Sequence, residues 1–375
     1  ITLRIKDNPF KVDYLNYKKK EENEIVLNFK GSQNKNNELV IKSFNLNEDE
    51  NFIKIKNLVF NEKLQISGLD KIDIDYLDQD RQKNSLTLKK SKKKYFLTGS
   101  SFNADNFIED LLSNDDKGSK IIDINSNLEI DIEKIFLDSE YYLRDFKGDI
   151  SIKNSEIQKA NLIGSFSKNK KLKFTINSVD NNKITTLFVD EAKPFVKRYK
   201  FIKGFDEGSL DFYSSKKSKK SVSQIKIYDF KLKELPILTK ILTLASLQGI
   251  ADILSGEGIR FTEFEMNFKN EGNLITIDEI YAIGPAISIL MEGYVEKNKL
   301  ISLKGTLVPA TTINNFIGSL PVLGEILVGK KTGEGVFGVS FKIKGPPKNL
   351  KTSVNPVKTL TPRFITRTLE KIKKN

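Results

Sequence analysis

The segments FEMNF (264–268) and LITIDEIYAIGPAISILMEGYV (274–295) decide the fold, because nearly every second residue in them is apolar. In the first segment, Phe264, Met266 and Phe268 alternate with Glu265 and Asn267. An alternation of period two is typical of a strand that has one apolar face and one polar face.

The same alternation recurs along the chain, in IDINSNLEIDIE (122–133) and in residues 72–76, 172–176 and 337–343. Turn-forming segments such as SKNKK and VDNNK separate the alternating stretches. Helical segments do not alternate with these strands, which argues against a parallel α/β architecture. We therefore predict a mainly β protein built from antiparallel strands.

Three regions are expected along the chain: two β-rich repeat regions at 1–112 and 113–214, and a C-terminal region at 215–375 that contains apolar helices. The lysine- and serine-rich segment 211–223 is the best candidate for a break between regions. LTGSSFNADNFIEDLL (97–112) and LKGTLVPATTINNFIGSL (303–320) share a weak repeat, in which a strand leads through Gly and a polar turn into a short helix.

Two apolar segments predict short helices near the C-terminal end. Pro236 suits a first helical turn, SGEG (255–258) supplies a stop, and polar residues between them fall on one narrow stripe. This helix either caps one end of the sheet or acts as a gate across it. In 316–328, Pro321 and Gly324 interrupt the pattern, so two short helices or a helix and a loop are expected.

Composition excludes several function classes. The chain contains no His, Cys or Trp, so it lacks the usual general base, the thiol nucleophile and the commonest transition-metal ligands. We expect no enzyme activity, no cofactor and no metal site. The net charge is +13, but only seven of the 62 basic residues are Arg, and the lysines stand beside Asn, Ser and Asp in turns. This pattern is untypical of nucleic-acid readers, and we expect no nucleic-acid partner.

The C-terminal part of the chain resembles the AsmA-like family of Gram-negative envelope proteins. The resemblance rests on three segments in a fixed order: IYDFKLKELPILTKILTLASLQGIADILSGEGIRF (227–261), the alternating strands 264–329, and EGVFGVSFKIKGPPKNLKTSVNPVKTLTP (334–362). FVDEAKPFVKRYKFIKGFDEGSLDF (188–212) extends it upstream. Thr312 departs from the aromatic residue expected before the Ile-Asn pair, which puts in doubt any role of that ring.

The resemblance implies a periplasmic protein, held to the inner membrane by an anchor upstream of this segment, that carries phospholipid towards the outer membrane. The fold it implies is an elongated, curled antiparallel sheet of repeated β units, whose apolar face forms a groove. The alternation alone is equally compatible with a sandwich, in which two apolar faces pack together and the protein is a scaffold for envelope protein partners without lipid cargo.

The predicted groove floor contains the apolar residues of the C-terminal strands: Phe264, Met266, Phe268, Ile275, Ile277, Ile287, Ile289, Met291, Ile301, Leu303, Phe337, Val339, Phe341 and Ile343. A basic amphipathic helix at the C-terminus is a candidate for binding an anionic membrane surface. Its basic and apolar residues are Arg363, Phe364, Ile365, Arg367, Leu369, Lys371, Ile372 and Lys374. Docking of its apolar stripe on the sheet explains the same pattern.

Overall fold

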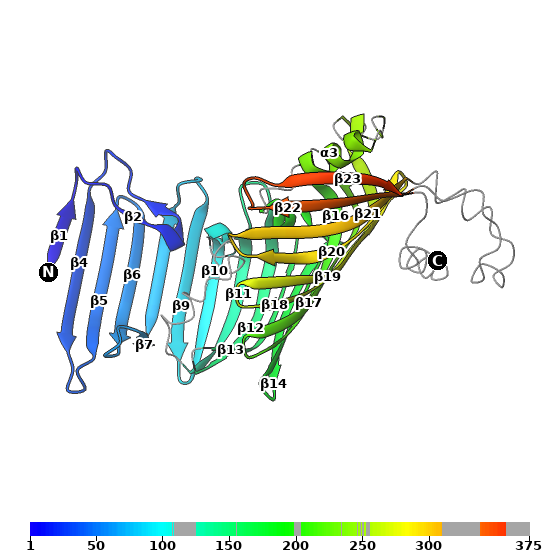
Figure 1. The fold of residues 1–375 in the computed structure, drawn as a ribbon. Helices are drawn as coiled ribbons and strands as arrows, with labels where there is room; N and C mark the ends of the chain where they lie inside the picture. The colour runs from blue at the N-terminus through cyan, green and yellow to red at the C-terminus, as the bar shows by residue number, and fades with distance from the viewer. Residues whose placement is uncertain are drawn as a thin grey trace. The chain divides into compact units, whose positions relative to one another are not determined.

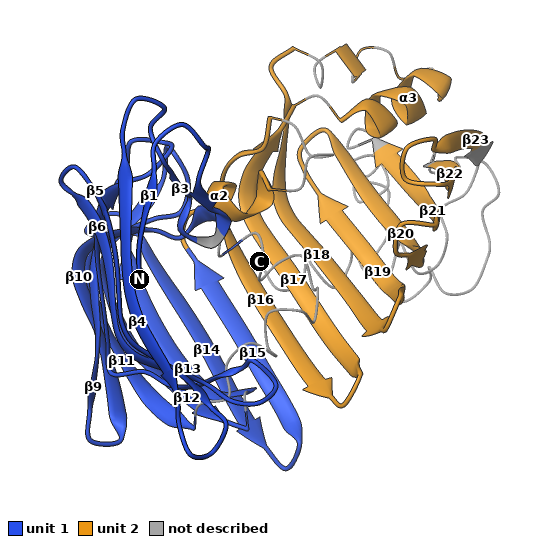
Figure 2. Cartoon of the chain, turned by 90° about the vertical axis from the view of Figure 1, so that its left-hand side faces the viewer, with its two compact units in different colours: residues 1–189 blue, residues 190–375 orange. Residues whose placement is uncertain are grey.

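The computed structural model describes residues 1–106, 108, 125–154, 156–198, 204–233, 235–245, 247, 249, 251–252, 256–309 and 338–357. The chain divides into two compact units, unit 1 (residues 1–189) and unit 2 (residues 190–375). Figure 2 colours unit 1 blue and unit 2 orange. Both units are built mainly from β-strands.

In unit 1 the strands pair in chain order, as Figure 1 shows, with β1 added beside β4. The short β7 pairs with β6, and β2 pairs with β3 in a separate ribbon. The bounds are β1 Thr2–Ile5, β2 Lys11–Val12, η1 Asp13–Leu15, β3 Tyr17–Lys18, β4 Ile25–Gln33, β5 Leu39–Glu48, β6 Asn51–Phe60, β7 Ile66–Gly68, β8 Lys71–Leu77, β9 Lys83–Ser91, β10 Lys94–Asn103, β11 Ser126–Phe136, β12 Tyr142–Lys153, β13 Glu156–Ser165, β14 Lys171–Val179 and β15 Asn182–Val189.

Strand register gives unit 1 one apolar face. Leu27, Leu46, Ile53, Ile74 and Leu86 stand directly opposite one another on five neighbouring strands. Residues opposite one another in a ladder point to the same face, so this row forms a continuous apolar strip. Every member of the row is buried.

In unit 2 the strands β16 to β23 also pair in chain order, and all of the described pairings are antiparallel. The short helices α2 and α3 accompany them among the described residues. The bounds are α2 Lys193–Val196, β16 Asp206–Lys217, β17 Lys220–Leu232, α3 Pro236–Leu244, β18 Ile259–Glu271, β19 Leu274–Ile283, β20 Ile287–Glu296, β21 Leu300–Pro309, β22 Gly338–Gly345 and β23 Lys351–Val357.

The prediction of a mainly β protein is confirmed, and that of purely antiparallel strands is wrong at one place. Strand β11 pairs parallel to β10. A parallel pair needs a crossover of a dozen or more residues rather than a tight turn, and residues 104–125 supply that length. Alternation in the sequence cannot distinguish the two cases, because both strand types have the same period.

Helix α3 begins at Pro236, at the predicted position, and ends at Leu244, before the predicted stop at 255–258. The segment 211–223, expected to be a break, instead forms the hairpin of β16 and β17, and the region boundary after residue 214 falls inside β16. Lysine and serine are compatible with a solvent-exposed hairpin as well as with a linker. The boundary after residue 112 and the helices expected at 316–328 and 363–374 lie outside the described residues.

Candidate functional site: the apolar face of unit 2

The register of strands β17 to β22 collects apolar side chains on one face of unit 2. Residues directly opposite one another form four rows across these strands. Row one is Ile227, Phe264, Ala282, Ile289, Leu307 and Val339; row two is Ile225, Met266, Ile280, Met291, Gly305 and Phe341; row three is Phe268, Ile277, Gly293, Leu303 and Ile343; row four is Ile275, Val295 and Ile301. We call this surface the apolar face.

The predicted groove-floor residues come together on this face. Those within the described residues belong to the four rows, except Ile287, which lies two positions before Ile289 on the same strand and therefore points to the same side. Phe337 lies outside the described residues. The sequence alternation was sufficient for this grouping, because a period of two fixes the face of each side chain once the register is known.

Burial changes from one edge of the apolar face to the other. Leu307 and Val339 of row one are completely buried, and Ile287 beyond them is too. Row four, at the other end of the strands, is half-buried throughout. We call the row-one end, at residues 232–259 and 283–287, the helix edge. The opposite end, formed by the connections 217–220, 271–274, 296–300 and 345–351, is the hairpin edge.

Helix α3 lies at the helix edge. It buries Leu238, Ile241 and Leu242 and packs beside β23. Lys240 and Thr243 of the predicted polar stripe are exposed. Figure 2 shows α3 at one end of the strands of unit 2, with the β16–β17 and β18–β19 hairpins at the other end. The helix therefore contributes to covering the buried end of the strands, in line with the capping interpretation of this segment.

Two glycines interrupt the rows where side chains would collide. A Cβ on Gly305 would lie 2.7 Å from Cζ of Phe341 and 2.7 Å from Cγ of Met291. A Cβ on Gly293 would lie 2.1 Å from the carbonyl oxygen of Ser302. The missing side chain at Gly305 thus leaves room for Phe341 and Met291 on the apolar face. The weak repeat at 303–320 predicts that the strand passes through Gly305 into a polar turn, whereas β21 continues to Pro309.

The opposite face of unit 2 is largely polar. Nζ of Lys304 lies 2.9 Å from a carboxylate oxygen of Glu292, and Nζ of Lys226 lies 3.8 Å from Glu265. The exceptions lie near the helix edge: a small buried cluster of Tyr281, Leu290 and Val308, and the buried Phe261, whose ring stacks on that of Phe230 at 5.4 Å. The two faces therefore differ in chemistry, one apolar and one charged, across most of the strands.

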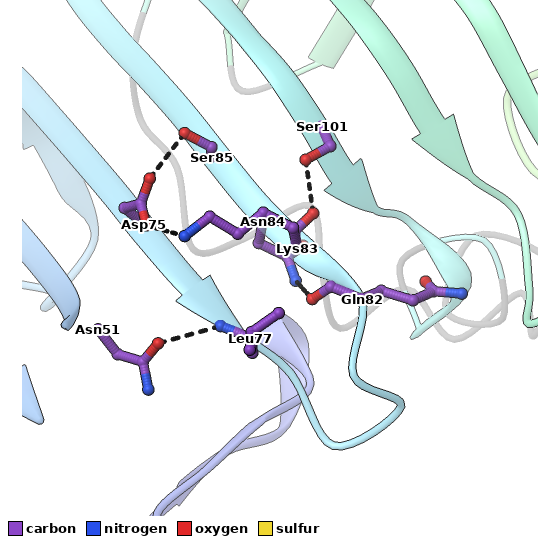
Figure 3. Close-up of polar contacts among 8 residues, drawn as sticks. All are labelled: Asn51, Asp75, Leu77, Gln82, Lys83, Asn84, Ser85 and Ser101. Carbon is purple, nitrogen blue, oxygen red and sulfur yellow. Dashed lines mark hydrogen bonds and ion pairs between the residues drawn. The ribbon is translucent and has the colours of Figure 1, made fainter. Parts of the chain in front are cut away.

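Unit 1 has the same two-faced organisation. Its polar face carries a cavity of about 300 Å³, lined by Phe52, Lys54, Asp73, Ile74, Asp75, Ser85, Leu86, Thr87, Thr98 and Gly99. Its carboxylates have partners: Asp75 accepts a 3.0 Å hydrogen bond from Ser85 and pairs with Lys83 (Figure 3), while Asp73 pairs with Lys71. In the same view the hydroxyl of Ser101 donates to the carbonyl oxygen of Lys83. Of its lining residues, Ile74 and Leu86 belong to the buried apolar row, and the others do not.

The segment between β1 and β4 covers one end of the apolar face of unit 1. Tyr17 is fully buried, with its ring against that of Tyr76 at 5.4 Å, and its hydroxyl donates a 2.7 Å hydrogen bond to Glu48. Glu48 is 1% exposed and also accepts from the backbone N–H of Lys20 and the side chain of Asn23. Burial, helped by the hydrogen bond to Glu48, raises the pKa of Tyr17 above its ordinary value. This phenol therefore stays protonated and holds the segment in place.

In the part of the chain that the structure describes, no helix has the length and hydropathy of a membrane span. No three Asp and Glu side chains of this described part converge as metal ligands would. The predicted membrane-surface residues, Arg363 to Lys374, lie outside the described residues.

Comparison with known proteins identifies no relative: no family model, no curated protein and no solved structure matches this chain.

Proposed function

We propose that this chain is a non-catalytic module of an AsmA-like bridge protein, which carries phospholipid between the inner and outer membranes along the apolar face. In this proposal the protein works in the periplasm and supports outer-membrane biogenesis. The sheet curls around its apolar side, so that the four rows of unit 2 form the floor of a trough for acyl chains.

One observation carries the proposal: the apolar face runs across β17 to β22, and its fourth row, Ile275, Val295 and Ile301, is only half-buried. In a sandwich, a second sheet would cover such a row. Within each unit, the described strands of the main sheet follow one another in a single order, and the only separate ribbon is β2 with β3. Acyl chains are the apolar groups that would suit this uncovered part.

The energetics suit a conduit. Burial of a methylene group from water contributes about 0.8 kcal/mol, so a chain of about sixteen carbons recovers on the order of 10 kcal/mol. A bilayer offers nearly the same gain, so the lipid is held against water and yet can leave for a membrane. Side chains without polar atoms, which make up most of the four rows, favour this balance because they form no specific bond with the cargo.

The chemistry of the rest of the described surface agrees with a non-catalytic role. The carboxylates around the polar-face cavity of unit 1 are paired with lysines and hydroxyls. The raised pKa of the buried Tyr17 works against its use as a nucleophile or a base. Both features favour a structural role for these polar groups.

The test is extraction of lipid from the purified chain followed by mass spectrometry, with two matched variants of β21. Ile301→Asp places an ion on the half-buried apolar row, where it has no partner of opposite charge in hydrocarbon. Ser302→Asp adds the same charge one residue later, on the opposite face. We expect the parent and Ser302→Asp to carry phospholipid, and Ile301→Asp to lose most of it while its melting temperature stays close to that of Ser302→Asp.

Two results would overturn the proposal. One is a folded parent protein that carries no lipid after expression or after incubation with vesicles, which favours the protein scaffold. The other is equal lipid content in Ile301→Asp and Ser302→Asp, which would place any bound lipid somewhere other than the apolar face.

A further inference from the structure

The hairpin edge of unit 2 concentrates lysines. The β16–β17 connection and the strand ends beside it contain Lys216, Lys217, Lys219 and Lys220, and the other connections of this edge add Lys297, Lys299, Lys348 and Lys351. Only Glu271 and Glu296 oppose them within these connections, paired with Lys220 at 2.8 Å and Lys299 at 2.7 Å.

Several of these lysines remain available to a ligand. Lys216, Lys219 and Lys348 are exposed, and none of them forms an ion pair with the described part of the chain. Lys216 also continues the alternation of Leu210 and Phe212 on β16, which stand opposite Ile227 and Ile225. Its side chain therefore leaves the strand on the same side as the apolar face.

The helix edge carries no excess of lysines. Its segment 232–259 contains two lysines and three carboxylates, and its connection at residues 283–287, Ile-Gly-Pro-Ala-Ile, contains no charged residue. The apolar row nearest to this edge is buried. The half-buried row four is adjacent to the hairpin edge. A lipid whose acyl chains cover row four would therefore have its polar headgroup at the lysines rather than at α3.

We infer that the hairpin edge selects phospholipids with anionic headgroups, whose phosphate lies among Lys216, Lys219 and Lys348 while the acyl chains cover the half-buried rows. This inference rests on the proposed function and adds a substrate class to it. The reason is charge complementarity, because an exposed ammonium group attracts an anionic headgroup and has little net attraction for a zwitterionic one. Salt screens such exposed charges, so the expected selectivity is modest.

The experiment uses the full chain, incubated with vesicles of equal parts phosphatidylglycerol and phosphatidylcholine and then re-isolated. Mass spectrometry gives the ratio of the two bound lipids. We expect the parent protein to enrich phosphatidylglycerol by about three- to tenfold, an enrichment that raised salt reduces. The triple variant Lys216→Gln, Lys219→Gln, Lys348→Gln should return the ratio to that of the vesicles without lowering the total lipid bound by more than about twofold.

A matched control removes the same charge from the other edge of unit 2, through Lys231→Gln, Lys233→Gln and Lys240→Gln. It should keep the enrichment of the parent. Equal loss in both triple variants would mean that overall charge, not the hairpin edge, sets the ratio, and would overturn the inference. Binding of both lipids without preference by the parent overturns the inference while the proposed function stands. Uptake of neither lipid overturns both.

Discussion

At the scale of single residues, the least predictable feature of the chain is the buried contact between Tyr17 and Glu48. A carboxylate that is 1% exposed is stable only where donors surround it, and here three donors from residues 17–23 do so. The partners are separated by 25 to 31 positions in the sequence. The local sequence does not predict this contact, because three consecutive acidic residues at 48–50 are typical of a solvent-exposed turn.

Replacing Tyr17 with Phe should test this contact through its pH dependence. The folded-state pKa of Tyr17 is raised, so above pH about 10 only the unfolded chain releases this proton, and stability falls as pH rises further. Below that pH both states keep the proton, and Tyr17 contributes no pH dependence. In Tyr17→Phe, the alkaline loss of stability should be shallower by up to about 1.4 kcal/mol per pH unit.

The same variant should cost about 1 to 3 kcal/mol of unfolding free energy at pH 7, since Glu48 loses one of its three donors. Urea unfolding at pH 7, 9, 10 and 11 supplies both quantities. A matched change at an exposed tyrosine, Tyr213→Phe, should alter neither. Parallel alkaline slopes for the parent and Tyr17→Phe would contradict the raised pKa.

At the scale of elements, the strands were predictable and their register was not. Alternation located the strands of unit 2 and grouped the floor residues on one face, because period two assigns sides without tertiary information. The register of β19 shifts opposite Asn267 and Phe268 and between Ile277 and Ile280. The only mark of this shift in the sequence is the pair Asp278 and Glu279, which breaks the alternation between Ile277 and Ile280. The parallel pair β10 and β11 was missed for a similar reason. Gly305 was expected to lead from a strand into a polar turn, whereas it lies within β21 and its missing Cβ makes room for two side chains.

Gly305→Ala should therefore destabilise the protein. The added Cβ would lie 2.5 Å from the carbonyl oxygen of Leu290, so β20 or the side chains of Met291 and Phe341 must move. Overpacking of this kind costs about 1 to 3 kcal/mol. Gly31→Ala is the control, because its Cβ would meet only the carbonyl oxygen of Val40, at an ordinary 3.5 Å. Chemical denaturation of both variants measures the difference, and equal stability would show that the apolar face is packed more loosely at Gly305 than these distances imply.

At the scale of the whole molecule, each unit independently presents an apolar face and a charged face. In unit 1, Phe44, Ile55, Ile72 and Leu88 stand opposite one another and are half-buried, as row four is in unit 2. Two such faces in one chain fit the proposed conduit better than a single binding pocket does. They also allow the alternative that each unit holds its own lipid. Sequence alternation predicts both faces and cannot distinguish these cases.

A charge placed on the apolar face of each unit should affect lipid binding and lipid transfer differently. The difference distinguishes one path along both faces from a separate lipid in each unit. Ile55→Asp in unit 1 and Ile301→Asp in unit 2 each place an uncompensated charge on a half-buried apolar row. If the faces form one path, lipid must pass both positions. Transfer of fluorescent phospholipid between donor and acceptor vesicles should then fall at least tenfold in either single variant, with little further loss in the double variant. Bound lipid should fall in steps, partly in each single variant and almost fully in the double.

Asn45→Asp, which adds a charge to the polar face of unit 1 opposite Lys54, is the control and should leave both measurements unchanged. Transfer that falls only partly in each single variant and almost completely in the double variant would instead mean that the two units carry lipid separately.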